Sequence, residues 1–258
     1  MGPHGQKRQG GRALIELENV AYSYGGGELL SNISLSLQPG SFHFLTGPSG
    51  AGKTTFLKLC YGALIPTSGH ARLFERDVRG MSRDDVALTR RRIGVVHQDV
   101  QFLDHLPLAD NVALPLTVSG RDSIDESANL KELLGWVGLR ARADALPPEL
   151  SGGERQRAAL ARAVIMSPDV ILADEPTGNL DTSTSDAMFN LFFTLNRELG
   201  TTFVIVTHSD DLAERMPRRI VMSDGLIAGD HRRSSPYRTA PAAPPADAED
   251  AGATLDPL

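Results

Sequence analysis

The sequence predicts an α/β domain with a parallel central sheet that is covered by helices on both faces. Two observations lead to this prediction. Short apolar runs suited to buried strands alternate with helical stretches, and two segments near the amino end show strict apolar–polar alternation. A length of 258 residues suits one such domain, with or without an inserted subdomain.

The first expected elements are antiparallel strands with one face in water. Ile15 and Leu17 alternate with glutamates, and Ile33, Leu35 and Leu37 alternate with serines. Five apolar runs then read as buried parallel strands: Phe42–Thr46, Ile93–His97, Val170–Ala173, Phe203–Thr207 and Ile220–Ser223. Helices are expected between them, over residues 53–63, 84–91, 152–166, 183–199 and 210–215.

Residues 100–150 break this rhythm, since they contain several prolines and helical pieces such as 126–137. We therefore expect an inserted, mostly helical subdomain over about 99–165, within a folded domain that spans 13–230. No internal repeat of 20 to 50 residues is visible.

Both ends of the chain differ from this domain. Residues 1–12 are rich in glycine and basic, which predicts a flexible basic tail. Residues 231–258 are rich in proline, alanine and acids, and such a segment cannot bury enough apolar surface to offset its ordering entropy. We expect this acidic tail to be disordered.

Composition excludes some functions. The net charge of -6 argues against a general nucleic-acid binder, which usually carries a basic surface, so no nucleic-acid partner is expected. A single cysteine, Cys60, allows no internal disulfide. No apolar run is long enough to span a bilayer, and no secretion signal is visible. A role at a membrane would require another protein to hold the chain there.

A phosphate-binding loop is the first functional motif. Residues 47–54 fit the pattern G-x-x-x-x-G-K-[ST] between a predicted strand and a predicted helix. Glycines let several N–H groups point at one anion, and the helix N-terminus adds partial positive charge. Lys53 would reach the β- and γ-phosphates, and the Thr54 hydroxyl would ligate Mg²⁺. The expected nucleotide-binding residues are Gly47, Pro48, Ser49, Gly50, Ala51, Gly52, Lys53, Thr54 and Thr55.

Two acids end the apolar run that begins at Val170. Asp174 is placed to hold the Mg²⁺ shell beside the phosphate loop. Glu175 points differently and could act as general base on a water in line with the γ-phosphate. A pair of solvated acids at a strand end is the alternative, so this prediction depends on the nearby loop.

Leu150-Ser151-Gly152-Gly153-Glu154 resembles the signature of the ATP-binding cassette (ABC) ATPases. Ser151 is a plausible N-cap, so the helix that follows offers a second anion-binding N-terminus with glycines for close approach. The resemblance implies a head-to-tail homodimer, in which Ser151, Gly152 and Gly153 of one subunit close over the ATP of the other. A Ser-capped helix with glycines for packing is the alternative.

Four more positions match this family in order. The resemblance implies that Tyr24 stacks on adenine, with Tyr22 as a competitor, and that Gln98 senses Mg²⁺ and water. It also implies that Asp181 lies at the dimer seam and that His208 contacts the γ-phosphate. The metal site would consist of Thr54, Gln98 and Asp174, and catalysis would depend on Glu175 and His208. Asp181 could equally begin a helix, and a core role is the alternative for the tyrosines and the histidine.

The resemblance covers about 15–228, with one departure: His97 stands where many relatives carry phenylalanine. It predicts a P-loop NTPase of the ABC type, with a parallel core sheet, an antiparallel β subdomain and an inserted helical subdomain. Chromosome-type cassettes insert a long coiled coil, and translation-type cassettes usually carry two motif sets; this chain has neither. A nucleotide kinase would have no use for the signature.

Within the family, Ala173–Asp181 resembles cassettes whose membrane partners have few spans and a large outer domain. Segments 57–61, 90–96 and 111–116 favour the cell-division FtsE family. That resemblance implies an FtsX-like integral membrane partner, control of septal cell-wall hydrolysis, and a peripheral location on the cytoplasmic face of the inner membrane. An ATPase of a lipoprotein-release or macrolide-type exporter is the alternative.

Overall fold

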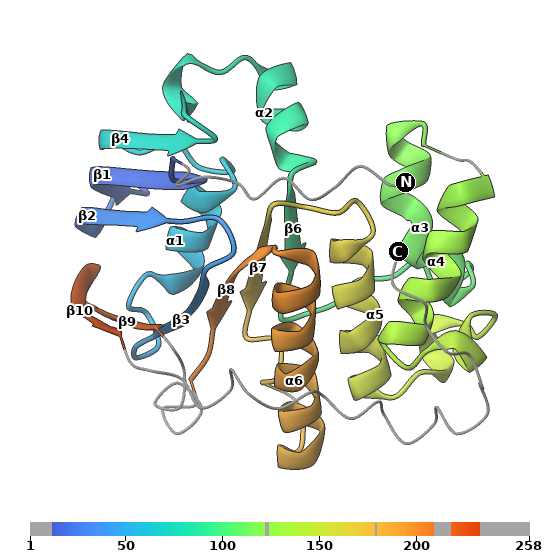
Figure 1. The fold of residues 1–258 in the computed structure, drawn as a ribbon. Helices are drawn as coiled ribbons and strands as arrows, with labels where there is room; N and C mark the ends of the chain where they lie inside the picture. The colour runs from blue at the N-terminus through green and yellow to red at the C-terminus, as the bar shows by residue number, and fades with distance from the viewer. Residues whose placement is uncertain (1–11, 122–123, 179, 209–217, 233–258) are drawn as a thin grey trace.

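The computed structural model describes residues 12–121, 124–178, 180–208 and 218–232. Two sheets and two groups of helices make up the described part of the chain (Figure 1). Three hydrophobic clusters hold these layers together. The α/β class with a parallel core sheet, an antiparallel β subdomain and a helical subdomain is confirmed.

The smaller sheet is antiparallel and has the order β2-β1-β4-β5. Its strands are β1 (Ile15–Ser23), β2 (Glu28–Leu37), β4 (Ser68–Leu73) and β5 (Arg76–Asp77). Ile15 and Leu17 are buried while Glu16 and Glu18 are partly exposed, which confirms the predicted alternation. The sequence did not predict β4 and β5.

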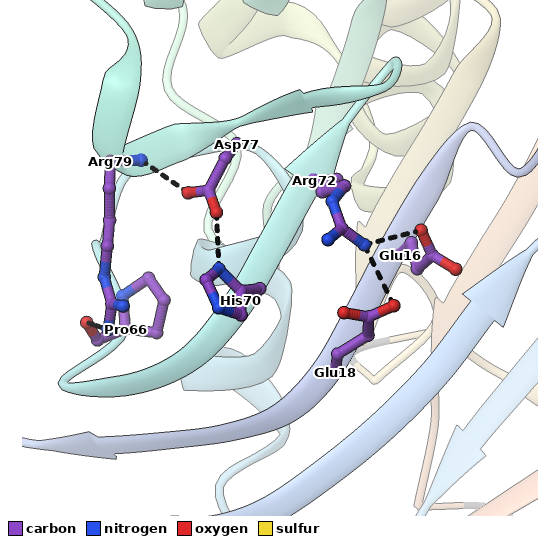
Figure 2. Close-up of polar contacts among 7 residues, drawn as sticks. All are labelled: Glu16, Glu18, Pro66, His70, Arg72, Asp77 and Arg79. Carbon is purple, nitrogen blue, oxygen red and sulfur yellow. Dashed lines mark hydrogen bonds and ion pairs between the residues drawn. The ribbon is translucent and has the colours of Figure 1, made fainter.

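Polar contacts tie the strands of this sheet together on its outer face (Figure 2). Arg72 on β4 pairs with Glu16 at 3.2 Å and with Glu18 at 2.9 Å, both on β1. Asp77 accepts from the Arg79 backbone N–H at 2.9 Å and lies 2.7 Å from the His70 ring. Cross-strand pairs of this kind stabilise a register weakly, and they need no functional explanation.

The larger sheet has the order β10-β9-β3-β8-β7-β6. Its strands are β3 (Phe42–Thr46), β6 (Ile93–Val96), β7 (Val170–Asp174), β8 (Thr202–Val206), β9 (Arg218–Ser223) and β10 (Leu226–Arg232). The five predicted parallel strands are confirmed within one or two residues at each end. The antiparallel edge strand β10 was not predicted, because its alternating exposed pattern is short and contains Gly229.

Helices cover both faces of this sheet (Figure 1). Leu45 faces α1 (Lys53–Cys60) and the antiparallel sheet, whereas its neighbour Phe44 faces the cluster that contains α5 (Gly152–Val164) and α6 (Thr182–Leu199). This alternation follows from the period of two along a strand. The helices predicted over 53–63, 84–91, 152–166 and 183–199 are confirmed, although 53–63 ends early, at Cys60.

The helical subdomain lies beyond α5, on the far side from the main sheet (Figure 1). It contains α3 (Leu108–Ser119) and α4 (Ile124–Trp136), which pack with one face of α5 in the third cluster. The fully buried Asn111 on α3 bonds to backbone groups of residues 103–107 and so fixes the loop before the helix. The sequence did not predict α3 as a helix, because Pro115 stands inside it.

The remaining elements are short. They are α2 (Arg83–Arg90) and the 3₁₀ helices η1 (Val78–Gly80), η2 (Arg140–Arg142) and η3 (Pro147–Glu149). The helix expected over 210–215 and most of both predicted tails lie outside the described residues. None of the helices in the described ranges is long and apolar enough to cross a bilayer.

Candidate nucleotide site

The candidate site lies where four adjacent strands of the main sheet end. Strands β3, β8, β7 and β6 are parallel neighbours, so their carboxyl ends share one edge. That edge is where open α/β sheets bind ligands. The residues at or just after the strand ends are, in spatial order, the phosphate loop 47–54, His208, the pair Asp174 and Glu175, and Gln98. The fold therefore brings these five predicted features together.

The phosphate loop owes its shape to two glycines. Gly47 has φ 147°, and a Cβ there would lie 2.0 Å from the Met222 carbonyl oxygen. Gly52 has φ 95°, and its Cβ would lie 2.4 Å from a methyl carbon of Leu30. A side chain at Gly47 would collide with the backbone of the strand that contains Met222, and the positive φ at both positions is one that residues with side chains rarely adopt. Pro48, Ser49 and Gly50 lie on the exposed outer turn, whereas Ala51 and Thr55 are buried.

Lys53 lies inside this loop rather than in solvent. Its Nζ donates to the carbonyl oxygens of Gly47 and Pro48, both at 2.8 Å, and the side chain is 6% exposed. Burial lowers the pKa of Lys53, while the nearby Glu175 and Asp174 carboxylates oppose that change. Among the described residues no side chain caps the N-terminus of α1 at Gly52. An anion in the loop would therefore meet a fixed cation and uncapped N–H groups.

Thr54 and Asp174 meet as the sequence predicted. The Thr54 hydroxyl donates to Asp174 Oδ2 at 2.9 Å, which joins α1 to the end of β7. Hydroxyl and carboxylate oxygens are ligands that Mg²⁺ prefers. No group of three or more His, Cys, Asp or Glu within the described ranges is arranged to hold a metal ion. These two oxygens therefore fit an ion that is also held by substrate phosphates, rather than an all-protein metal cage.

Glu175 and His208 form an ion pair between Oε1 and Nε2. They follow β7 and β8, whose last residues, Asp174 and Val206, are register partners. Glu175 has φ 49°, a left-handed conformation that is unfavourable for a residue with a side chain and recurs at functional sites. Its side chain is 17% exposed and that of His208 is 50% exposed. Glu175 is thus largely enclosed by protein, whereas His208 is accessible to solvent.

Gln98 lies beside Glu175 across Gly178. A Cβ built on Gly178 would be 3.7 Å from Glu175 Oε2 and 3.8 Å from Gln98 Nε2. Both side chains thus approach the same turn after β7. The Gln98 side chain is exposed, so it is available to a ligand at the strand ends.

The signature segment 150–154 begins α5 as predicted. Ser151 Oγ accepts from the Glu154 N–H at 3.3 Å, and Glu154 Oε2 accepts from the Ser151 N–H at 2.8 Å, which makes a reciprocal capping box. The hydrogen bond from the Ser151 backbone is the main cause that lowers the pKa of Glu154, and Arg142 adds to it. Arg142 Nε lies 3.1 Å from Glu154 Oε1, and its guanidinium also donates to the Glu149 carbonyl at 2.8 Å. The pattern S-x-x-E could have predicted the capping box, but no pattern pointed to Arg142.

The two glycines of the signature have different surroundings. A Cβ on Gly153 would lie 2.8 Å from Thr184 Cγ2, so α5 packs tightly on the start of α6. A Cβ on the exposed Gly152 would meet, among the described residues, only Leu180 at 3.9 Å. Packing within the chain therefore explains a glycine at 153 but leaves the glycine at 152 unexplained.

Asp181 is the N-cap of α6. It accepts hydrogen bonds from Ser183, at 2.6 Å, and from the backbone and hydroxyl of Thr184, at 3.0 and 2.6 Å. The hydrogen bonds from these two side chains lower the pKa of Asp181 well below its ordinary value. The sequence allowed two roles for Asp181, and the structure shows that it begins a helix. Its contact with a second chain stays a prediction.

The two tyrosines have separate places. Tyr22 packs against the core, and Tyr24 contacts its ring edge-on with centroids 4.8 Å apart. Tyr24 is 60% exposed, so its ring is the one with a free face. A planar base could stack there.

The chain is similar in sequence to known proteins over most of its length. A family model described as ABC transporter matches residues 30–178. The chain is 38% identical to the cell division ATP-binding protein FtsE of Bacillus subtilis, over 85% of this chain and 97% of that protein. It is 41% identical to the lipoprotein-releasing system ATP-binding protein LolD of Myxococcus xanthus, over 84% of this chain and 99% of that protein.

Solved structures agree with the sequence relatives. The ATP-binding cassette MJ0796, in a dimeric post-hydrolysis state with ADP and Pi, superposes with a TM-score of 0.76 at 33% identity, covering 84% of this chain and 98% of that one. The protein cbiO1 from Clostridium perfringens, part of the transporter complex cbiONQ, gives a TM-score of 0.79 at 26% identity, covering 86% and 89%. The chain therefore belongs to the ABC transporter family and is an ATP-binding, ATP-hydrolysing subunit of that family.

Proposed function

We propose that this ATPase hydrolyses Mg·ATP between two copies of itself arranged head to tail. One observation carries the proposal: the N-terminus of α5 is glycine-rich and exposed, and no packing contact with the described residues requires a glycine at 152. Such a helix end suits a phosphate that approaches from outside. The similar cassette MJ0796 is dimeric in its solved structures, which supports the same arrangement here.

Each site would combine groups from both chains. Tyr24 would stack on the base, and the loop with Lys53 would hold the phosphates. Thr54 and Asp174 would hold Mg²⁺, with Gln98 beside them. When bound, Mg²⁺ supplies positive charge that offsets the charge of the phosphates. Ser151, Gly152 and Gly153 of the second chain would close over the γ-phosphate.

Glu175 would act as the general base. Its backbone conformation aims the side chain past the end of β7, beside Gln98 and His208. A carboxylate there can accept a proton from a water in line with the γ-phosphate. When nucleotide is bound, His208 would exchange its contact with Glu175 for one with the γ-phosphate. Half of its side chain is exposed to solvent, so the ring is accessible to such a ligand.

We also propose a role in cell division, through an FtsX-like membrane partner. The support is 38–40% identity to FtsE proteins over nearly their whole length. ATP-driven closure of the dimer would be transmitted to the partner, which controls septal cell-wall hydrolysis. The chain would sit on the cytoplasmic face of the membrane through this partner alone. The surface between the main sheet and the helical subdomain, where Leu103 is 43% exposed, would receive a cytoplasmic helix of the partner.

A second candidate is an ATPase of a lipoprotein-release or macrolide-type exporter. LolD proteins are 40–41% identical to this chain, the same level as the FtsE proteins. Both groups are named as ATP-binding proteins, so ATP binding does not distinguish them. Only the membrane partner distinguishes the two functions.

Capture of that partner is the test. The full chain with an affinity tag and the substitution Glu175→Gln, which should slow dissociation of the closed state, is expressed in its native host and purified from detergent-solubilised membranes with ATP present. An FtsX-like protein with few spans and a large outer domain is the expected prey. A lipoprotein-releasing permease, or an exporter with an outer-membrane duct, would instead establish the transport function. Lys53→Ala serves as the control for capture that does not depend on nucleotide.

A further inference from the structure

The segment 98–102 connects β6 to the helical subdomain and has no regular secondary structure. Its carbonyl oxygens therefore need donors from elsewhere. Three side chains of α5 supply them, which joins the segment that carries Gln98 to the helix that carries the signature. The hydrogen bonds are Gln156 Nε2 to the Gln98 oxygen at 3.2 Å, the Arg155 guanidinium to the Val100 oxygen at 3.4 Å, and the Arg162 guanidinium to the Gln101 oxygen at 2.8 Å.

Arg162 makes the firmest of these contacts. Besides its 2.8 Å hydrogen bond, its guanidinium lies over the ring of Phe102, with 4.8 Å from Cζ to the ring centroid. Phe102 in turn packs against the cluster that contains α6 and against the cluster that α3, α4 and α5 share. Burial lowers the pKa of Arg162, which agrees with a cation held against protein rather than in water. One side chain thus fixes both the backbone and the ring of the connecting segment.

The α5 helix also links two functional positions. Its N-terminus presents Ser151 to Gly153 at the surface, and its body packs against both β6 and α3. Gln98, at the start of the connecting segment, lies beside Glu175 across Gly178. Coupling between sites is carried by rigid elements and contiguous packed contacts, so the packing of α5 and its hydrogen bond from Gln156 offer a route from its N-terminus to Gln98.

We propose that Arg162, assisted by Gln156, is a positioning residue that ties the Gln98 segment to the signature helix. This inference rests on the proposed head-to-tail dimer. In that dimer the signature of one chain contacts the nucleotide of its partner, and Gln98 contacts the nucleotide bound to its own chain. Because of this tie, the signature of a chain closes on the partner's nucleotide in the same movement that places Gln98 at the chain's own nucleotide. Each chain thereby couples the two ATP sites of the dimer.

The first test asks whether the tie exists, and it needs neither nucleotide nor a dimer. Amide hydrogen exchange is measured on the full chain for the wild type, Arg162→Met and the control Arg197→Met, which removes an exposed arginine paired with Glu198 on α6. Arg162→Met should speed exchange in residues 98–106 by about tenfold or more, at the hydrogen-bonded Leu103 and Leu106 amides that follow Phe102, with α3 and α5 still protected. Equal exchange in all three proteins would overturn the proposal. If Arg162→Met does not fold, Arg162→Lys, which keeps a donor but loses the planar stacking, should show a smaller increase.

The second test asks whether the tie matters for turnover. The Kd of the chain for ATP and the steady-state kcat are measured for the same variants. Arg162→Met should keep the Kd for ATP within about twofold while kcat falls roughly tenfold to a hundredfold, because a displaced group near the reaction costs rate rather than binding. Arg162→Lys should recover most of kcat. An unchanged kcat, or a loss of kcat matched by loss of binding, contradicts the proposal.

The two failures can be told apart. If Glu175→Gln stays monomeric with ATP bound, the head-to-tail dimer is wrong, whereas faster exchange at 98–106 in Arg162→Met would still establish the tie. If the dimer forms and exchange is unaffected, the tie is wrong and the dimer stands.

Discussion

Two helices of this domain begin at glycine-rich turns, and their N-termini are built differently. At α1, Lys53 is buried against loop carbonyls and Thr54 bonds to Asp174 at the end of β7. At α5, Ser151 and Gly152 are exposed, and the helix end is capped by the helix's own Ser151 and Glu154. The α1 end is joined to the acids at the strand ends, while the α5 end faces outward. The difference agrees with the proposed arrangement, in which the α1 end holds a nucleotide within the chain and the α5 end meets a nucleotide that another chain carries.

Glu175→Gln should have the largest effect, because it removes the proposed base beside the α1 end without touching either helix. Turnover should fall on the order of 10²- to 10⁴-fold, while ATP binding persists. The measurement is steady-state ATPase activity alongside equilibrium ATP binding. Turnover like that of the wild type would remove Glu175 from the mechanism.

Lys53→Ala should impair nucleotide binding at the N-terminus of α1 and leave the N-terminus of α5 unchanged. Hydrogen bonds to charged groups contribute about 1.5–3 kcal/mol, so the Kd for ATP of a single chain should rise roughly 10- to 100-fold. Equilibrium binding at protein concentrations that keep the chain monomeric measures this. Unchanged affinity would contradict the assignment of the loop.

Gly152→Glu should impair the contact of the α5 N-terminus with the partner's nucleotide and leave the N-terminus of α1 unchanged. A Cβ at 152 would clash with none of the residues that the structure describes, so the variant should fold, but its carboxylate would face the partner's phosphates. Like charges placed together at an interface are costly, and kcat should fall at least about tenfold with the single-chain Kd for ATP unchanged. Gly152→Ala, which adds bulk without charge, is the matched control and should lose less activity. Full activity in Gly152→Glu would mean that this helix end meets no nucleotide.

Asp230→Asn should change stability without changing either helix end. Asp230 accepts two hydrogen bonds from Arg218, at 2.8 and 2.7 Å, across β9 and β10, and these hold the pKa of Asp230 below its ordinary value. A lowered pKa stabilises the fold above the unfolded-state value and loses that effect as pH falls through the folded value. The variant should lose about 1 kcal/mol of unfolding free energy near neutral pH, and less near about pH 3.

Urea unfolding at the two pH values measures this difference. The Kd for ATP and kcat should match the wild type, which would separate global stability from the effects at the two helix ends. A loss of the same size at both pH values would contradict the role of the ionised carboxylate.

The sequence predicted the fold well where pattern and burial agree. The five parallel strands and the helices that begin at Lys53 and Gly152 follow from apolar periodicity and glycine-rich turns. Strand β10 and helix α3 were not predicted, because β10 lies exposed at a sheet edge and α3 contains Pro115. In both cases tertiary packing overrides a weak local pattern.

The candidate site divides in the same way. The phosphate loop, Asp174 and Ser151 occur in short motifs with a direct physical reading, so the sequence located them. The pairing of Glu175 with His208 depends on which strands are neighbours, and the contacts of Arg142 and Arg162 depend on tertiary packing. Arginines that donate to loop carbonyls leave no periodic signal, so only the structure reveals them.

The mass of Glu175→Gln in solution tests the central claim most directly. With saturating Mg·ATP, light scattering should give about twice the chain mass of 27.7 kDa, and without nucleotide the dimer should be lost. Gly152→Glu added to Glu175→Gln should return the mass to that of one chain while ATP stays bound. A single-chain mass for Glu175→Gln with ATP bound would contradict an active site that is shared between two copies.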